Sequence, residues 1–456
     1  MAKLFGTDGM RGEAGRFPLD TATVRKVGSS LAAHLSEKME GRAPVIVTGR
    51  DTRESGVWLE RALIAGATEA GARCQSAGVI STPGVAFLAR TLPADAGVVI
   101  SASHNPYQDN GVKIFSPSGK KLADSIERLI EADIFAAVAK AAVNGAKTAP
   151  SETNDSEATR LRALYLDFLA DEIAQGLSLN DLSVVIDCAN GAASNLAPNL
   201  FARLGANVVA INSEPDGRNI NRDCGSLHIE GLQRKVLEGR ADLGVAFDGD
   251  ADRALFVDAR GRFVDGDATL WVLAKYFSAR GELHEGIVVA TVMSNIGLEI
   301  ALRSRGLRLV RTDVGDKYVL DELLRAGASL GGEQSGHLIF PRLSLAGDGM
   351  TTTLCLLRAM QEEKARLDEL TTGFERYPQI LLNVSVREKK PFTEIASVQA
   401  VARGIEEKLG DRGRLLLRYS GTESLARVMI EGQSQSDIEE HARRLALAIE
   451  ESIGAH

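Results

Sequence analysis

The chain has 456 residues, of which 44% are hydrophobic and 25% charged, and its formal net charge is −8. This length exceeds what one hydrophobic core usually supports, and the acidic balance argues against sequence-independent nucleic-acid binding, which needs a dominant basic surface. The four cysteines are scattered without a C-x-x-C pair and no long apolar run occurs, so the sequence predicts a cytoplasmic protein without a disulfide framework, a zinc site or a membrane span.

The first part of the chain alternates short apolar, β-branched runs with helical patterns, which is typical of parallel α/β units. Residues 45–47 and 98–100 are predicted strands, and each runs into a polar loop, at 49–53 and 101–106. A polar segment at 144–157 has the composition of a linker.

The same layout restarts twice. One block contains the predicted strands 184–187, 208–211 and 243–247, and another begins at 287–293, where Ser294-Asn295 is typical of a helix cap. From about residue 376 the pattern changes to strands and amphipathic helices, with a strand at 380–386 and helices from about 393 and over 436–453.

We therefore expect an α/β protein with three related α/β domains, built on mixed or parallel sheets, and a C-terminal α+β domain, arranged around a central active-site cleft. The expected boundaries are 1–155, 156–256, 257–372 and 373–456.

Three aspartates, Asp248, Asp250 and Asp252, alternate directly after the apolar run 245–247, and Arg253 follows them. Like charges within about 7 Å of extended chain repel one another, and a hard divalent cation with oxygen ligands relieves this. An EF-hand is excluded because its bidentate glutamate position holds Ala259. The alternatives are a solvated acidic turn and a magnesium site beside an anion that Arg253 contacts.

The loop 101–106 places Ser103 next to His104. No G-x-S-x-G elbow is present here, which argues against a hydrolase triad. A phosphate-carrying serine suits the aspartate loop better, because a phosphoserine oxygen can complete a magnesium shell. Downstream, residues 109–113 predict a turn that presents Lys113, which in isolation reads as an ordinary surface charge.

Two further loops carry polar groups that suit a sugar phosphate. Glu333 and Ser335 lie two apart between glycines, so that both side chains can grip neighbouring sugar hydroxyls, although a polar hairpin tip has the same pattern. Near the C-terminus, arginines, hydroxyls and a glycine can cradle a phosphate. The members of this group are Arg418, Ser420, Gly421, Thr422 and Arg427.

Taken together, five motifs resemble the α-D-phosphohexomutase superfamily over essentially the whole chain. They are Phe5-Gly6-Thr7-Asp8-Gly9-Met10-Arg11-Gly12 and the loops 101–106, 248–253, 332–337 and 418–423, in this order. Within the superfamily the chain looks most like the bacterial phosphoglucosamine mutase group, because it combines Gly-Glu-Gln-Ser-Gly-His with Arg-x-Ser-Gly-Thr-Glu. Three residues depart from the family pattern: Ala251 replaces a glycine, so we expect an ordinary negative φ there, Met10 replaces an isoleucine and Ser424 a frequent proline.

The resemblance implies a role for each motif. Ser103 is the expected phosphoserine, and it holds one Mg²⁺ per chain together with Asp248, Asp250 and Asp252. Arg11 and Arg253 are expected near the transferring phosphate, with His104 and Lys113 as proton carriers. The expected sugar-binding residues are Glu333, Ser335 and His337, and the expected binders of the phosphate that is not transferred are Arg418, Ser420, Gly421, Thr422 and Arg427.

The implied reaction interconverts glucosamine 6-phosphate and glucosamine 1-phosphate through a 1,6-bisphosphate, which feeds UDP-N-acetylglucosamine and cell-wall precursor synthesis. The primer of Ser103 is either such a bisphosphate or an activating kinase, and homodimerisation is a family expectation. No nucleic acid or membrane partner is expected. The alternatives are a phosphomannomutase or phosphoglucomutase, a magnesium-dependent sugar phosphatase, and a catalytically silent sugar-phosphate sensor.

Overall fold

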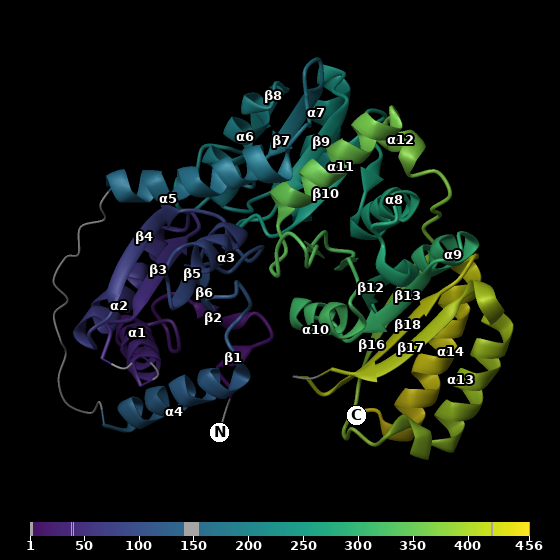
Figure 1. Cartoon of the computed structure of the whole chain (residues 1–456). Helices are drawn as coiled ribbons and strands as arrows, with labels where there is room; N and C mark the ends of the chain where they lie inside the picture. Colours follow the sequence, from purple (N-terminus) through teal and green to yellow (C-terminus); the bar gives the residue numbers. More distant parts are fainter. Residues whose placement is uncertain (1–2, 38, 40, 141–154, 421–422, 456) are drawn as a thin grey trace. The chain divides into compact units, whose positions relative to one another are not determined.

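The computed structural model of the chain describes residues 3–37, 39, 41–140, 155–420 and 423–455 (Figure 1). The chain divides into two compact units, one formed by residues 1–292 and 310–372 and the other by residues 293–309 and 373–456. Most of the linker predicted at 144–157 lies outside the described residues, and the four domain boundaries stay a prediction. Across the described part of the chain, no helix is long and apolar enough to cross a membrane.

The N-terminal sheet has six strands in the order β1-β2-β6-β5-β3-β4. Strands β3 (Val45–Arg50), β4 (Arg73–Val79) and β5 (Ala96–Ile100) run parallel, whereas β6 (Asp109–Phe115), β2 (Gly9–Glu13) and β1 (Phe5–Gly6) pair antiparallel. Helices α1 (Thr21–Ser36), α2 (Glu54–Glu69), α3 (Thr82–Thr91), α4 (Asp124–Lys140) and α5 (Asp155–Asp167) accompany this sheet. The sheet is mixed because its antiparallel half begins where β5 meets β6.

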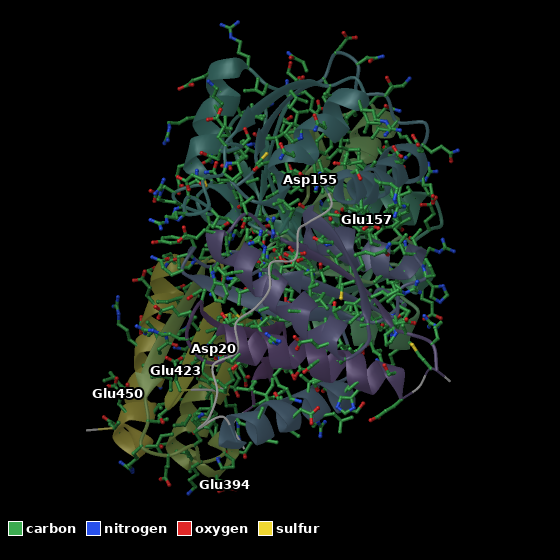
Figure 2. All side chains as sticks on the ribbon, turned by 90° about the vertical axis from the view of Figure 1, so that its left-hand side faces the viewer. Asp20, Asp155, Glu157, Glu394, Glu423 and Glu450 are labelled. Atoms are coloured by element: carbon green, nitrogen blue, oxygen red, sulfur yellow. The ribbon has the colours of Figure 1, made fainter. Side chains whose placement is uncertain are left out.

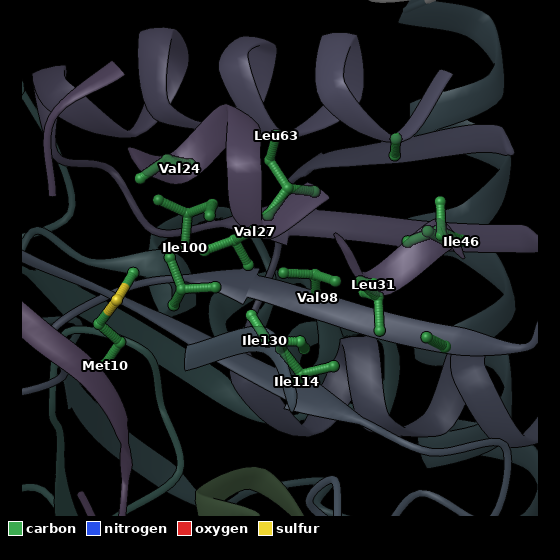
Figure 3. Packing of buried hydrophobic residues seen from close by; sticks show 14 of the residues in the cluster. Met10, Val24, Val27, Leu31, Ile46, Leu63, Val98, Ile100, Ile114 and Ile130 are labelled. Atoms are coloured by element: carbon green, nitrogen blue, oxygen red, sulfur yellow. The ribbon is translucent and has the colours of Figure 1, made fainter. Parts of the chain in front are cut away.

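The core of this block consists mostly of aliphatic side chains from the sheet, α1, α2 and α4, as Figure 3 shows for Val27, Leu63 and Ile100. Helix α1 begins after Asp20, labelled in Figure 2, whose carboxylate accepts the Thr23 N–H at 2.9 Å. Helices α1 and α2 approach closely because they meet at glycines: a Cβ at Gly66 would lie 1.9 Å from the carbonyl oxygen of Arg25.

The second sheet has the order β11-β10-β9-β7-β8. Strands β7 (Ser183–Asp187), β8 (Asn207–Ile211) and β9 (Leu243–Phe247) are parallel, and β10 (Ala254–Asp258) pairs antiparallel with β9 and β11 (Phe263–Val264). Helices α6 (Ala197–Arg203) and α7 (Glu230–Gly239) belong to this block. The aspartate loop is therefore the connection of the β9–β10 hairpin, at the end of a fully buried strand.

The third sheet has the order β13-β12-β14-β15, with β12 (Ile287–Thr291) parallel to β14 (Leu330–Gly332) and β15 (Leu338–Ile339) antiparallel to β14. The other elements of this part of the chain are β13 (Arg308–Thr312), α8 (Gly266–Ala279), α10 (Asp316–Ala326), α11 (Gly349–Glu363) and α12 (Leu367–Leu370). The loop with Glu333 and Ser335 connects the β14–β15 hairpin.

The second unit contains a three-stranded antiparallel sheet in the order β16-β18-β17, which confirms the predicted α+β pattern. Its elements are α9 (Ile296–Ser304), β16 (Gln379–Ser385), α13 (Ala396–Leu409), β17 (Arg414–Tyr419), β18 (Leu425–Glu431) and α14 (Gln435–Ile453). The predicted cap is confirmed, because Asn295 Oδ1 accepts the N–H of Gly297 at 3.0 Å. The apolar faces of α13 and α14 pack with the sheet into one core.

Candidate active site

The side chains of Asp248, Asp250 and Asp252 converge as the sequence predicts, with one oxygen of each carboxylate within 4.8 Å of the others, and all three residues are buried. Asp250 Oδ1 and Asp252 Oδ1 are buried without a hydrogen-bond partner. Burial, together with the charges of Asp252 and Asp250, raises the pKa of Asp248 well above its ordinary value. Buried carboxylates with free oxygens are a donor set that fits a hard divalent cation.

The turn that holds these carboxylates contradicts one prediction. Ala251 has a φ of 56°, so the expectation of a negative φ is wrong. The Ala251 N–H donates to the carbonyl of Asp248 at 3.1 Å, and the Ala251 carbonyl accepts the N–H of Gly349 at 3.1 Å. The tight turn and these two bonds fix the left-handed conformation, which costs an alanine about 1–2 kcal/mol.

Ser103 follows strand β5 and reaches the aspartate loop, which lies 145 positions further along the chain. Its Oγ donates to Asp248 Oδ2 at 2.5 Å. The Nδ1 atom of His104 lies 3.2 Å from the same Oγ. Only 1% of Ser103 is exposed, and its φ of 52° is unusual for a serine. The structure therefore places the predicted nucleophile against the predicted metal ligands.

The imidazole of His104 contacts the Ser103 hydroxyl. Burial, and then the charges of Arg253 and Arg11, lower the pKa of His104 to about 4. A depressed histidine pKa means that folding opposes the charged form, so this group costs stability as the pH falls from about 6.5 towards 4.

We expect the His104 ring of the unphosphorylated, metal-free protein to stay neutral at pH 6. NMR titration of the imidazole signals, with the His104→Gln variant to assign the resonance, checks this. A His104 signal that titrates at or above pH 6 contradicts the expectation.

Lys113 lies inside strand β6, so the prediction of a turn with a surface lysine is wrong. Only 1% of Lys113 is exposed, and its Nζ lies 2.8 Å from Asp250 Oδ2 and 3.3 Å from Asp252 Oδ2. Burial alone would lower the pKa of Lys113, but Asp250, Asp8 and Asp252 together raise it well above its ordinary value. The lysine is therefore a charged partner of the aspartate cluster.

A cavity of about 500 Å³ lies beside the serine and the aspartate loops. It is lined by Arg11, His104, Asp252, Arg253, Glu333 and His337, together with residues 3, 4, 6–9 and 314–316. The Nε atoms of Arg11 and Arg253 are buried without a hydrogen-bond partner. Two guanidinium groups with free Nε donors, at a cavity that the carboxylates of Asp252 and Glu333 also line, suit a phosphorylated sugar.

The predicted sugar-binding loop contributes to this cavity from β14 and β15. Glu333 Oε1 accepts the N–H of Gly315 at 3.1 Å, and Ser335 Oγ donates to Glu333 Oε2 at 3.2 Å. Nε2 of His337 lies 4.0 Å from a carboxylate oxygen of Asp252 and of Asp316. Glu333 and His337 line the cavity, whereas Ser335 does not line it and hydrogen-bonds to Glu333.

The predicted phosphate cradle belongs to the second unit. Arg418 on β17 is the register partner of Arg427 on β18, and Arg427 Nη2 lies 3.4 Å from Ser420 Oγ. Arg427 also pairs with Glu423, labelled in Figure 2, at 3.1 Å, and its Nε is buried without a partner. Gly421 and Thr422 lie outside the described residues. The structure thus brings together Arg418, Ser420 and Arg427.

Comparison with known proteins decides the family. Four family models match, namely phosphoglucomutase/phosphomannomutase alpha/beta/alpha domains I, II and III over residues 2–140, 163–261 and 265–377, and the C-terminal domain over residues 381–448. The chain belongs to the phosphoglucomutase/phosphomannomutase family. This confirms the predicted resemblance and the predicted fold class.

Relatives within this family cover the whole chain. It is 49% identical over 455 residues to a phosphoglucosamine mutase of Solibacter usitatus, covering 100% of both chains, and 47% identical to that of Deinococcus radiodurans, covering 98% of both. Among solved structures, a family protein of Burkholderia thailandensis shares the fold with a TM-score of 0.78, 23% identity and 99% coverage of both chains. An N-acetylphosphoglucosamine mutase of Aspergillus fumigatus, in complex with GlcNAc-6P and magnesium, has a TM-score of 0.63, 18% identity and coverage of 98% and 95%.

Two further residues contact the predicted site residues of this family member, and the sequence did not predict either of them. The Asp8 carboxylate pairs with Arg11, with Lys121 at 2.6 Å and with Lys113 at 3.3 Å. Burial alone would raise the pKa of Asp8, but these three cations lower it well below its ordinary value. Thr82 Oγ1 donates to Asp250 Oδ2 at 2.5 Å. Asp8 lies within the motif at residues 5–12, which could have indicated its role, whereas no sequence pattern marks Thr82.

Proposed function

We propose that this enzyme interconverts glucosamine 6-phosphate and glucosamine 1-phosphate through a phosphoserine at residue 103 and a glucosamine 1,6-bisphosphate. The single observation that carries the chemistry is the hydrogen bond from Ser103 to Asp248 within the buried aspartate cluster. The substrate assignment is supported by phosphoglucosamine mutases that are 43–49% identical over the whole chain, which also indicate an isomerase.

Asp248, Asp250, Asp252 and a phosphoryl oxygen on Ser103 are the proposed ligands of Mg²⁺. When bound, the cation neutralises charge on the transferring phosphoryl group. Arg11 and Arg253 supply guanidinium donors to that group. Because both carry an unpartnered buried Nε, a phosphate oxygen completes their hydrogen bonding.

The phosphoryl group passes from Ser103 to the free hydroxyl of the substrate: the bond between phosphorus and Ser103 Oγ breaks, the bond to the sugar oxygen forms, and the hydroxyl proton leaves. His104 and Lys113 are the proposed proton carriers. The imidazole of His104 is neutral and can accept a proton directly. Lys113 is protonated while its carboxylate partners are charged, so it can accept a proton only when these partners are neutralised and its pKa falls. Return of the other phosphate to Ser103 completes the isomerisation.

Substrate specificity and orientation come from the remaining residues. Glu333, Ser335 and His337 bind sugar hydroxyls, and Arg418, Ser420, Gly421, Thr422 and Arg427 hold the phosphate that is not transferred. We also propose cytoplasmic location, homodimerisation, and first phosphorylation of Ser103 by a bisphosphate primer or an activating kinase.

We expect glucosamine 6-phosphate to be turned over faster than glucose 6-phosphate or mannose 6-phosphate, each tested with Mg²⁺ and a bisphosphate primer. Initial rates of sugar 1-phosphate formation measure the preference. A clear preference for a neutral hexose overturns the substrate assignment. Stoichiometric inorganic phosphate without sugar 1-phosphate indicates a phosphatase, and substrate binding without turnover indicates a sensor.

A further inference from the structure

The segment between β3 and α2, residues 51–53, has no part in the chemistry above, yet it contains a fully buried arginine. Arg53 is 0% exposed and donates to backbone carbonyls of the segment that follows β5. Its Nη2 donates to the carbonyls of Ser103 (2.9 Å) and Asn105 (2.8 Å), and its Nη1 donates to those of Asp109 (3.1 Å) and Pro106. One guanidinium group thus donates to three carbonyls of the loop 101–106 and to the carbonyl of Asp109, the first residue of β6.

Asp51 connects this arginine to the Ser103 backbone by a second route. Its Oδ2 accepts from Arg53 Nε at 2.9 Å and from Ser101 Oγ at 2.6 Å. Ser101 Oγ in turn accepts the N–H of Ser103 at 2.9 Å. Both the N–H and the carbonyl of Ser103 are therefore held by one buried ion pair.

Asn221, from the second α/β block, reinforces the same contacts. Its Nδ2 donates to the carbonyls of Ser103 (2.8 Å) and Asn105 (3.0 Å). The acidic loop also closes against Ser103, because a Cβ at Gly249 would lie 2.5 Å from the Ser103 carbonyl oxygen. Such dense bonding is what a serine with a φ of 52° requires to stay in that conformation.

We infer that Arg53, together with Asp51, is a positioning residue that fixes the backbone of Ser103 so that its Oγ faces the aspartate cluster. This inference rests on the proposed function. Arg53 does not line the cavity beside Ser103, so its removal reduces phosphoryl transfer and leaves substrate binding largely intact. The distinction is measurable as a fall in kcat without a matching rise in KM.

The test compares Arg53→Met and Arg53→Lys with Leu63→Ala, a variant that opens a cavity in the core of the same block and removes none of these hydrogen bonds. For each protein, kcat and KM for glucosamine 6-phosphate, the Tm, and the fraction of Ser103 phosphorylated by glucose 1,6-bisphosphate are measured. Arg53→Met is expected to lower kcat by about 100-fold with KM within about 3-fold, because misplacement by about 1 Å costs this much. Arg53→Lys retains the charge and loses the fork geometry, so we expect its kcat to lie between those of the wild type and Arg53→Met.

Leu63→Ala is expected to lower the Tm and keep kcat. A wild-type kcat in folded Arg53→Met, or an equal loss of kcat in Leu63→Ala at a similar Tm, overturns the inference. If Arg53→Met does not fold, Arg53→Lys provides the test, because it keeps the buried charge beside Asp51 and loses the forked donation to the carbonyls of Ser103 and Asn105. A kcat unchanged from wild type in Arg53→Lys also overturns the inference. Failure of the proposed function shows separately, as wild-type enzyme that forms no glucosamine 1-phosphate.

Discussion

The Ser103→Ala variant is expected to fold and to lose mutase activity by about 10,000-fold or more, since a reaction that needs a covalent phosphoryl carrier has no substitute for the missing oxygen. The hydroxyl makes two polar contacts, to Asp248 and His104, so its loss costs about 1–3 kcal/mol of stability and not the fold. Activity, the Tm and the intact mass before and after phosphatase treatment measure the outcome. The wild type should carry a phosphate-sized adduct that the variant lacks.

Ser118→Ala is the matched control, because Ser118 is an exposed serine of the same block. We expect it to keep both activity and the adduct. A fully active Ser103→Ala variant, or one that still carries the adduct, would show that another residue accepts the phosphoryl group.

The residues that the sequence predicted well are those whose chemistry restricts the residue type. Three alternating aspartates after an apolar run have few explanations, and a hairpin between buried strands brings them together without distant contacts. Local pattern alone could not place Ser103 beside the aspartates, because its contact with Asp248 joins two α/β blocks. The family resemblance, which rests on five motifs in a fixed order, predicted this contact.

Lys113 and Ala251 show where local reasoning fails. Asp109-Asn110-Gly111 has a turn composition, but this segment pairs with β2, and the rest of the same strand pairs with β5. These pairings override the local preference. Ala251 adopts a positive φ because of hydrogen bonds to Asp248 and Gly349, one of which is 98 positions away by residue number. Arg53 and Thr82 were not predicted because all that identifies them is a set of partners from distant loops.

Replacing Asp248 with asparagine is expected to reduce turnover by about 1,000-fold and to stabilise the metal-free protein. The turnover loss follows because a metal ion contributes several kcal/mol to charge stabilisation and each 1.36 kcal/mol is tenfold in rate. The stability gain follows because burial and two neighbouring carboxylates raise the pKa of Asp248, so the ionised form opposes folding. In the wild type this cost develops as the pH rises from the ordinary carboxyl range through the raised pKa, and asparagine removes it.

Magnesium should stabilise the wild type much more than the Asp248→Asn variant. The wild type gains about 2.7 kcal/mol when Mg²⁺ is present at 100 times its Kd, whereas Asp248→Asn gains little because one ligand charge is lost. Thermal unfolding with and without Mg²⁺, at several pH values, measures both effects. Asp181→Asn is the control, since it changes the net charge equally at an exposed site. A metal-free Asp248→Asn protein that is less stable than the wild type, or one that Mg²⁺ stabilises equally, would mean that these carboxylates are balanced by Lys113 and Arg253 alone and need no cation.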